Sequence, residues 1–410
     1  MVRSARIRQR VTRRQRDRAA VLFLSEDLVL WEIFYRLPAK ALLRCRAVCR
    51  SWRRLTCDAE FLLAYHRRQP SLPLFWFSDA TRSSAPATVD AFDLRQSPAV
   101  RRPILGFSNN IECCKYYIHA SCDGLLLLSG KKVDKYYSFF SIRKFDKYYI
   151  CNPATRQWCA LPDVSDVAAL YHHRPSGEYR VLYRKQHPDG LAGSVVYYVL
   201  TVGSSLEGQR CIGLPVSSPS LKKLMTDGQL DGGHPPVPLH DCLHWYSGSY
   251  LDNKGKVLVF HTVDESFRCM KPAIAGYKAN LRQMDGTLYI RHWDPYTMIV
   301  QVWALQDYEM EVWSFKCKIQ LPVLEIRKYF SAREQPVWEV VSDNGDMLIT
   351  GHWSGFLLHC DSKGKLVDKF QKDFKSPGVP LSFKESFVRH AFFERKDHKR
   401  VKLVGFFRGL

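Results

Sequence analysis

The sequence lacks long hydrophobic runs and lacks the motifs that mark common enzyme sites. Its longest apolar stretches, such as VVYYVL at 195–200, are far shorter than the roughly 20 residues that a membrane-spanning helix requires. It contains no P-loop (G-x-x-x-x-G-K-[S/T]), no dinucleotide-binding motif (G-x-G-x-x-G) and no nucleophile elbow (G-x-S-x-G). We therefore expect no membrane span, no catalytic residues and no cofactor.

Acidic residues are scarce, and their shortage is local. The 410 residues include 61 Lys plus Arg and 40 Asp plus Glu, a formal charge of +21. Residues 1–70 carry a net charge of +11, and the other 340 residues share +10. The first eighteen residues hold eight arginines opposed only by Asp17. We expect residues 1–20 to be a disordered basic tail, and the alternative function is nucleic-acid binding through this tail, although it has no aromatic residues for base stacking.

Signs of secretion are also missing. The 13 cysteines are an odd number at low density, and none of the six asparagines begins an N-x-Ser/Thr sequon. The only apolar run after the first arginines spans 19–24, and no small-residue cleavage site follows it. This pattern predicts a reducing compartment, the nucleus and/or the cytoplasm.

One stretch, HDCLH at 240–244, resembles a metal-binding pattern. His240 and His244 would reach one metal ion only from a helix, because on a strand they would stand about 13 Å apart at about 3.3 Å per residue. Prolines before the stretch and Ser-Gly after it favour strand or loop. Cys45 and Cys49 are expected to share a helix face but have no second cysteine pair. No metal site is predicted.

Residues 21–68 have the pattern of a small helical module. Ser25 is a suitable N-cap for a first helix, which Pro38 should end. Leu42, Cys45, Cys49 and Trp52 then recur at helical spacing, which predicts a second helix. Asp58 can cap a further turn that presents Phe61, Leu62 and Tyr65. So small a unit is marginal alone, and its surplus apolar surface indicates either packing on the rest of the chain or a partner.

The stretch LSEDLVLWEIFYRLPAKALLRCRAVCRSWRRL resembles the F-box. It departs from the family's pattern at Ser25, where the family usually has proline. The resemblance implies docking to a Skp-type adaptor and, through it, to a cullin. It also implies that a set of residues divides between the module's own core and the adaptor-binding surface: Leu28, Ile33, Leu37, Pro38, Leu42, Leu43, Val48, Cys49 and Trp52.

After residue 70 the periodicity becomes that of short strands. Runs such as GLLLLS, VVYYVLTV and KVLVFHTV alternate with Asp-, Asn- and Gly-rich turns such as MDGT and DSKGK. At about 40–50 residues per blade, 340 residues predict a β-propeller of roughly seven or eight blades. The expected fold class is α+β multidomain, a small helical F-box followed by a large all-β domain. Residues 69–100 are expected to hold a linker and the first strands, and 101–410 the β-domain.

A second resemblance lies within this β-domain. HASCDGLLLLS at 119–129, YYICNPATRQWCALP at 148–162 and GEYRVLYR at 177–184 are similar to the F-box-associated domain of plant F-box proteins. Residues 163–176 and 203–237 match least. We interpret Asp123-Gly124 and Asn152-Pro153 as turns. Four tryptophans are interpreted as packing residues between blades: Trp158, Trp245, Trp303 and Trp313.

Together the two resemblances imply the substrate-recognition subunit of an SCF-type cullin-RING ubiquitin ligase. In such a subunit the F-box docks the adaptor and the β-domain binds a protein substrate, whose identity the sequence does not reveal. A propeller enzyme such as a glycosidase would instead require paired carboxylates at the channel mouth.

Overall fold

The computed structural model describes residues 25–77, 87–96, 99–107, 114–132, 147–186, 195–213, 235–248, 255–274, 279–284, 286–294, 296–330, 336–340, 346–351, 355–371 and 381–393. The chain divides into two compact units. The first comprises the residues up to Gln69 together with Phe387–Arg389, and the second comprises Pro70–Ser386 and the residues from His390 onward. Residues 69–100, expected to hold a linker and the first strands, contain two complete strands of the second unit.

The first unit is built from short helices. They are η1 (Leu28–Ile33), η2 (Phe34–Arg36), α2 (Ala39–Cys45), α3 (Arg50–Leu55) and α4 (Ala59–Arg68). Ser25 accepts a hydrogen bond from the Leu28 amide at 3.2 Å, and Asp58 Oδ1 accepts one from the Phe61 amide at 2.9 Å. Both predicted caps are therefore confirmed. No helix in the described part of the chain has both the length and the hydrophobicity to cross a membrane.

The second predicted helix is wrong in one respect, because it breaks in two. α2 ends at Cys45, and Cys49 takes an extended conformation with φ −154° and ψ 167° as the N-cap of α3. Its Sγ accepts from the Trp52 amide at 3.4 Å. Val48, a β-branched residue with low helix propensity, stands in the connection. Cys45 and Cys49 therefore do not share a helix face, and the 3.6-residue spacing across the break was coincidental.

A short segment from near the end of the chain completes the core of the helical unit. Phe387 is buried and its ring stacks on Tyr65, with centroids 6.1 Å apart. The Arg46 guanidinium lies over the Phe387 ring, 5.2 Å from its centroid. Tyr65 in turn donates a hydrogen bond to the Leu37 carbonyl at 2.7 Å. The unit thus gains an aromatic side chain that is more than 300 positions away in sequence.

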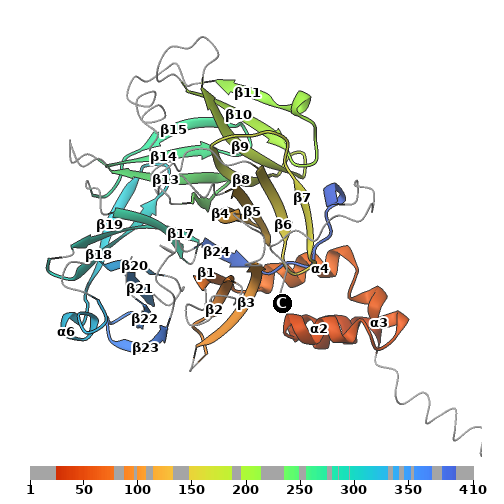
Figure 1. The fold of residues 1–410 in the computed structure, drawn as a ribbon, viewed down its shortest axis with the longest axis horizontal. Coiled ribbons are helices and arrows are strands. Elements are labelled where there is room, and N and C mark those ends of the chain that lie inside the picture. The colour runs from red at the N-terminus through yellow and green to blue at the C-terminus, as the bar shows by residue number, and fades with distance from the viewer. Residues whose placement is uncertain are drawn as a thin grey trace, which may run out of the picture. The chain divides into compact units, whose positions relative to one another are not determined.

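The second unit consists of six four-stranded antiparallel sheets (Figure 1). From inner to outer strand they are β4 (Cys114–Cys122), β5 (Leu125–Lys132), β6 (Lys147–Asn152), β7 (Gln157–Ala160); β8 (Val167–His173), β9 (Glu178–Gln186), β10 (Val195–Thr201), β11 (Arg210–Gly213); β12 (Val237–Leu239), β13 (Cys242–Gly248), β14 (Gly255–His261), β15 (Ser266–Met270); β16 (Ala279–Met284), β17 (Thr287–Asp294), β18 (Ile299–Asp307), β19 (Val312–Gln320); β20 (Pro336–Val340), β21 (Met347–Gly351), β22 (Phe356–Cys360), β23 (Leu366–Gln371); and β24 (Leu381–Lys384), β1 (Ser71–Phe77), β2 (Ala87–Asp93), β3 (Val100–Phe107). Short helical turns η3 (Leu206–Gly208), α6 (Val323–Ile326) and η5 (Ala391–Phe393) connect or follow strands.

These six sheets form a closed β-propeller. A buried apolar cluster joins each sheet to the next, and the last one joins β21 and β22 to β1 and β2. The sixth sheet takes its inner strand, β24, from near the C-terminus and its three outer strands from the start of the unit. This pairing closes the ring with main-chain hydrogen bonds, so the sheet contributed by β1–β3 is not left with an open edge.

The propeller prediction is confirmed, but the predicted seven or eight blades are wrong. Six sheets share the roughly 340 residues because the connections between strands are longer than the 40–50-residue repeat allows. The run Leu125–Leu128 shows why such strands lack alternation. Leu125 and Leu127 join the cluster toward β8–β11, and Leu126 and Leu128 join the cluster toward β1–β3. Both faces are buried, so all four leucines are fully buried.

The two turns predicted from the Asp-Gly and Asn-Pro pairs are present and contact the segment that follows the last strand. Asp123 and Gly124 have φ 48° and 83° between β4 and β5. A Cβ on Gly124 would stand 2.3 Å from the Ser386 Cβ, so only glycine fits. The buried Asn152 caps its own turn through Oδ1 and donates from Nδ2 to the Ser386 carbonyl at 3.0 Å.

Three of the four tryptophans pack between blades as predicted, namely Trp158, Trp245 and Trp313. Trp303 departs from the prediction. Its ring packs edge-on against Phe315 of the same blade, with centroids 5.5 Å apart. Strand position alone does not tell which face of a blade a side chain meets.

Candidate functional site

The helical unit leaves much of its apolar surface in solvent. Of the nine residues that the F-box resemblance singled out, six are exposed: Leu28, Ile33, Pro38, Leu43, Val48 and Cys49. Val48 is 63% exposed and Leu28 is 49% exposed. Exposed aliphatic side chains at this density on a unit of about 45 residues are typical of a protein-docking surface. We call the set of these six residues and Leu63 the apolar face, a name that refers to their shared exposure.

The other three residues of that set belong wholly or partly to the unit's core. Leu42 is 0% exposed, so a charge there would unfold the unit. Trp52 is half-buried, edge-on to Phe34 with ring centroids 4.9 Å apart. Leu37 is half-buried and ends η2 with an extended backbone at ψ 145°. Of the nine residues, three are therefore buried or half-buried and six are exposed.

Sequence reasoning missed one exposed apolar residue, Leu63 on α4. Phe61, Leu62 and Tyr65 on the same helix, which the sequence placed together on this turn, are buried. Leu63 follows Leu62 by one position, a rotation of about 100° around the helix, which takes it away from that buried face. An apolar residue outside the helical period was the signal that could have identified it.

The propeller contains a pocket along its axis. The pocket has a volume of about 650 Å³, and the inner strands of five sheets line it, β4, β8, β12, β16 and β24. We call it the axial pocket. Pockets of this size hold small molecules or single side chains and short segments of a protein partner.

Among the described residues that line the axial pocket, basic side chains outnumber acidic ones. They are Arg174, Arg282, Arg291 and Lys384, against the carboxylates of Asp123 and Asp241. Asp241 is already engaged, because Arg174 donates to it from Nε at 2.8 Å and from Nη1 at 2.9 Å. Asp123 accepts a hydrogen bond from the Tyr179 hydroxyl at 3.1 Å. The pocket therefore favours a ligand that brings negative charge.

Arg291 is the most unusual member of the lining. It is 2% exposed, and within the described residues its one hydrogen bond goes from Nη2 to the Met284 sulfur at 3.0 Å. A thioether is a weak acceptor for a guanidinium. Burial, reinforced by the charge of Arg282, shifts the pKa of Arg291 well below its ordinary value. Burial also lowers the pKa of Arg282 to about 10. No described carboxylate forms an ion pair with Arg291.

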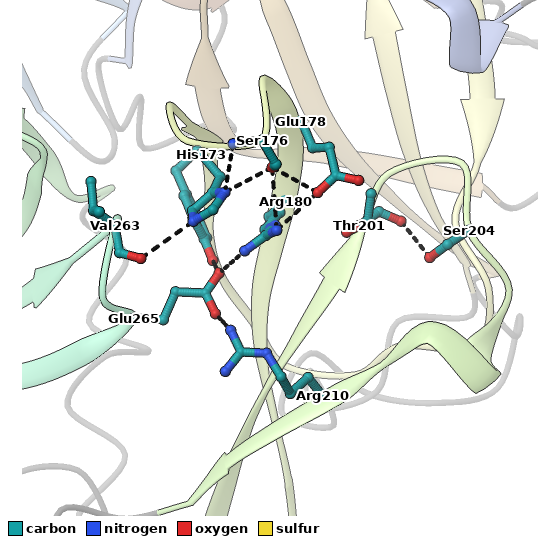
Figure 2. Close-up of polar contacts among 10 residues, drawn as sticks. His173, Ser176, Glu178, Arg180, Thr201, Ser204, Arg210, Val263 and Glu265 are labelled. Atoms are coloured by element: carbon teal, nitrogen blue, oxygen red, sulfur yellow. Dashed lines mark hydrogen bonds and ion pairs between the residues drawn. The ribbon is translucent and has the colours of Figure 1, made fainter.

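A second charged cluster lies between the blade of β8–β11 and the turn before β15, and here the charges are matched (Figure 2). The buried carboxylate of Glu265 accepts from Arg180 at 2.6 Å and from the Tyr171 hydroxyl at 2.7 Å, and it pairs with Arg210. Arg180 also pairs with Glu178 at 2.8 Å. A charge network satisfied on this many sides is typical of a structural clamp between blades rather than a ligand site.

The HDCLH stretch lies in the hairpin that joins β12 to β13. His240 and Asp241 form the turn with φ 48° and 56°, so the predicted strand-or-loop conformation is present. Both ring nitrogens of the buried His244 are engaged, Nδ1 with the Val237 carbonyl at 2.9 Å and Nε2 with the Tyr308 hydroxyl at 2.8 Å. Burial lowers the pKa of His244 to about 4. Among the described residues no group of three potential ligands could hold a metal ion.

The basic tail of residues 1–20, on which the alternative nucleic-acid function depends, lies outside the described residues.

Comparisons with known proteins place both units in context. Residues 27–64 match the F-box-like family. The chain is 26% identical over 323 residues to an F-box protein of Arabidopsis thaliana, covering 73% of this chain and 79% of that protein. It is 24% identical over 390 residues to a putative F-box/kelch-repeat protein of the same plant, covering 83% and 85%. Among solved structures, a prolyl endopeptidase aligns with a TM-score of 0.39 and 10% identity over 83% of this chain and 47% of that one, a similarity too low to carry an argument.

Proposed function

We propose that this chain, which carries an F-box-like domain followed by a six-bladed β-propeller, is the substrate-recognition subunit of an SCF-type cullin-RING ubiquitin ligase. Its homology to Arabidopsis F-box proteins over most of its length supports the proposal. In this proposal the apolar face of the helical unit docks a Skp-type adaptor. The propeller binds a protein substrate.

The mechanism requires no catalytic residue in this chain. An adaptor bound to the helical unit would connect the chain to a cullin and to the charged ubiquitin carrier. A substrate bound to the propeller would then present its lysines at high effective concentration, which accelerates transfer by proximity alone. We propose accordingly that the chain is a non-catalytic adaptor.

The observation that best supports this proposal is the contrast within the nine resemblance residues. Leu28, Ile33 and Val48 are aliphatic side chains that a small unit could have buried, yet they are exposed. Leu42, from the same set, is fully buried. Burying such side chains against a partner would contribute roughly 1.5–3 kcal/mol each.

The proposal is tested by co-expressing the full chain with a Skp-type adaptor. The wild-type chain should co-purify with the adaptor, and the double variant Leu28→Asp with Val48→Asp should lose it because charge would have to be buried at the contact. Val367→Asp is the matched control, since Val367 is a similarly exposed aliphatic residue, at 52%, but lies on the propeller. Circular dichroism would check that every variant is folded. A folded wild-type chain that never co-purifies, or a double variant that co-purifies normally, would refute the proposal.

We also propose that the chain acts in the nucleus and/or the cytoplasm. No disulfide joins any of the eleven cysteines that the structure describes, and Cys151 and Cys360 lie in the apolar clusters between blades, where they pack as small hydrophobic side chains. Addition of a reductant should therefore leave the melting temperature of the purified chain unchanged.

A further inference from the structure

The axial pocket contains a charge that the described protein does not neutralise. Arg291 lies on β17 and is fully buried, and its sole described hydrogen-bond acceptor is the Met284 sulfur. An arginine cannot discard its proton at neutral pH, so its burial costs free energy unless an anion compensates it. The Glu265 cluster of the same propeller shows the usual solution, because every charge there has a partner of opposite sign.

A second arginine stands beside the first. In the β16–β17 ladder Arg282 pairs with Tyr289, and Arg291 follows Tyr289 by two positions on the same face. Such diagonal neighbours have β-carbons roughly 7–8 Å apart. The two guanidinium groups carry like charge and repel one another, and this repulsion is part of what lowers the pKa of Arg291. Both side chains also line the cavity.

From this geometry we propose that the axial pocket is an anion site in which Arg291 and Arg282 bind a carboxylate or phosphate group carried by the protein substrate. The planar fork of a guanidinium matches both oxyanions with paired hydrogen bonds. An incoming anion would remove the unfavourable burial of Arg291, so part of the binding free energy comes from relief of that cost.

The assignment to a protein ligand rests on the proposed function, whereas the anion site itself does not. A cavity of about 650 Å³ accommodates one or two side chains. Nucleic acid would need an open basic surface along several phosphates. The anion measurements need no adaptor, so their failure would be distinguishable from failure of adaptor docking.

The first experiment titrates inorganic phosphate, and separately acetate, into the purified full chain by calorimetry and follows the melting temperature. We expect at least one of these anions to bind at a single site. Arg291→Met should lower the affinity of that site at least tenfold. Without added anion, Arg291→Met should melt at the same temperature as wild type or higher, because an uncompensated charge is replaced by an apolar chain of similar length. Arg327→Gln, which removes an exposed charge on the turn after α6, should change the affinity less than twofold.

Arg282→Gln provides a second variant in case Arg291→Met does not fold, and should weaken binding at least fivefold. An anion affinity that neither pocket variant changes, or a wild-type chain that binds neither anion at this site, would overturn the proposal.

The second experiment identifies the carrier of the anion. Degenerate nonapeptides with a central glutamate, or with a central phosphoserine, would compete against the bound small anion. We expect one peptide set to compete in an Arg291-dependent manner, and the better set tells carboxylate from phosphate. If a single-stranded oligonucleotide of equal charge competed and neither peptide set did, the assignment to a protein ligand would be overturned.

Discussion

The helical unit and the propeller manage their difficult side chains in opposite ways. The helical unit buries aromatic residues such as Phe34 and Phe61 and leaves aliphatic residues such as Leu28 and Val48 in solvent. The described part of the propeller buries most of its large aliphatic residues and takes charged groups such as Glu265 and Arg291 into its interior. An exposed apolar face is suited to constant docking of one partner, whereas a charged cavity can discriminate between ligands. The contrast supports the proposal that one unit binds an adaptor and the other selects a substrate.

The largest effect should come from removing the buried carboxylate of Glu265 from the propeller. Glu265→Ala would leave Arg180, which is mostly buried, without its main partner, and we expect a loss of about 3–5 kcal/mol in the free energy of unfolding of the propeller. Glu178→Gln is the control, because this carboxylate contacts the same arginine but its side chain is 43% exposed against 1% for Glu265, and it should cost at most about 1 kcal/mol. Chemical denaturation measures both. Equal losses in the two variants would mean that Glu265 is no clamp.

The helical unit should prove sensitive to a residue far from it in sequence. Phe387→Ala removes a buried ring from beside Tyr65, and we expect the unfolding free energy of the helical unit to fall by about 3 kcal/mol, the low end for a buried phenylalanine. Hydrogen exchange of the α4 amides would report the loss. Phe315→Ala, which truncates an exposed ring on the propeller, should leave those amides unchanged. Unaltered protection of α4 in Phe387→Ala would contradict the description of this core.

The apolar face and the core of the helical unit should separate in mutagenesis. Leu43→Asp changes an exposed residue, and we expect it to weaken adaptor binding roughly thirtyfold, about 2 kcal/mol, without altering stability. Leu42→Ala changes its buried neighbour and should destabilise the unit by about 2–5 kcal/mol. Binding and melting measurements on the same two proteins test the distinction. A stable Leu42→Ala protein would show that the two residues had been assigned the wrong way round.

The most gradual predicted effect is the pH dependence of the propeller. Burial lowers the pKa of His244 in the folded chain to about 4, below the ordinary value of about 6.5 in the unfolded chain. The unfolded state therefore binds more protons between these values, and stability is complete above pH 6.5 and is lost as the pH falls toward 4. The slope should be about 1.4 kcal/mol per pH unit from this residue. His244→Gln should flatten that slope in urea denaturation at several pH values, and an identical slope would refute the assignment.

The sequence was most informative where local chemistry decides the structure. The Ser25 and Asp58 caps, the Asp123-Gly124 turn and the propeller class follow from residue type and spacing within a few positions. The break at Cys49 did not, because Leu42, Cys45, Cys49 and Trp52 keep helical spacing across it. The blade number depends on connection lengths, which hairpin signals do not supply.

The most consequential residues of the propeller could not be predicted at all. In sequence, Arg282 and Arg291 look like the polar positions of half-exposed strands, and nothing local distinguishes Arg291, which is buried, from an arginine in solvent. Glu265 is likewise an ordinary turn residue until the neighbouring blade brings Arg180 to it. Strands distant in sequence assemble the axial pocket and the Glu265 cluster around these residues, so periodicity carries no trace of either site.

One calorimetric comparison asks whether the two units carry separate binding functions. A purified Skp-type adaptor would be titrated into three folded proteins: wild type, the double variant Leu28→Asp with Val48→Asp, and Arg291→Met. We expect adaptor binding by wild type, at least a thirtyfold loss of affinity in the double variant, and less than a twofold change in Arg291→Met. A double variant that binds like wild type, or an Arg291→Met chain that loses the adaptor, would show that the two units do not divide the binding functions in this way.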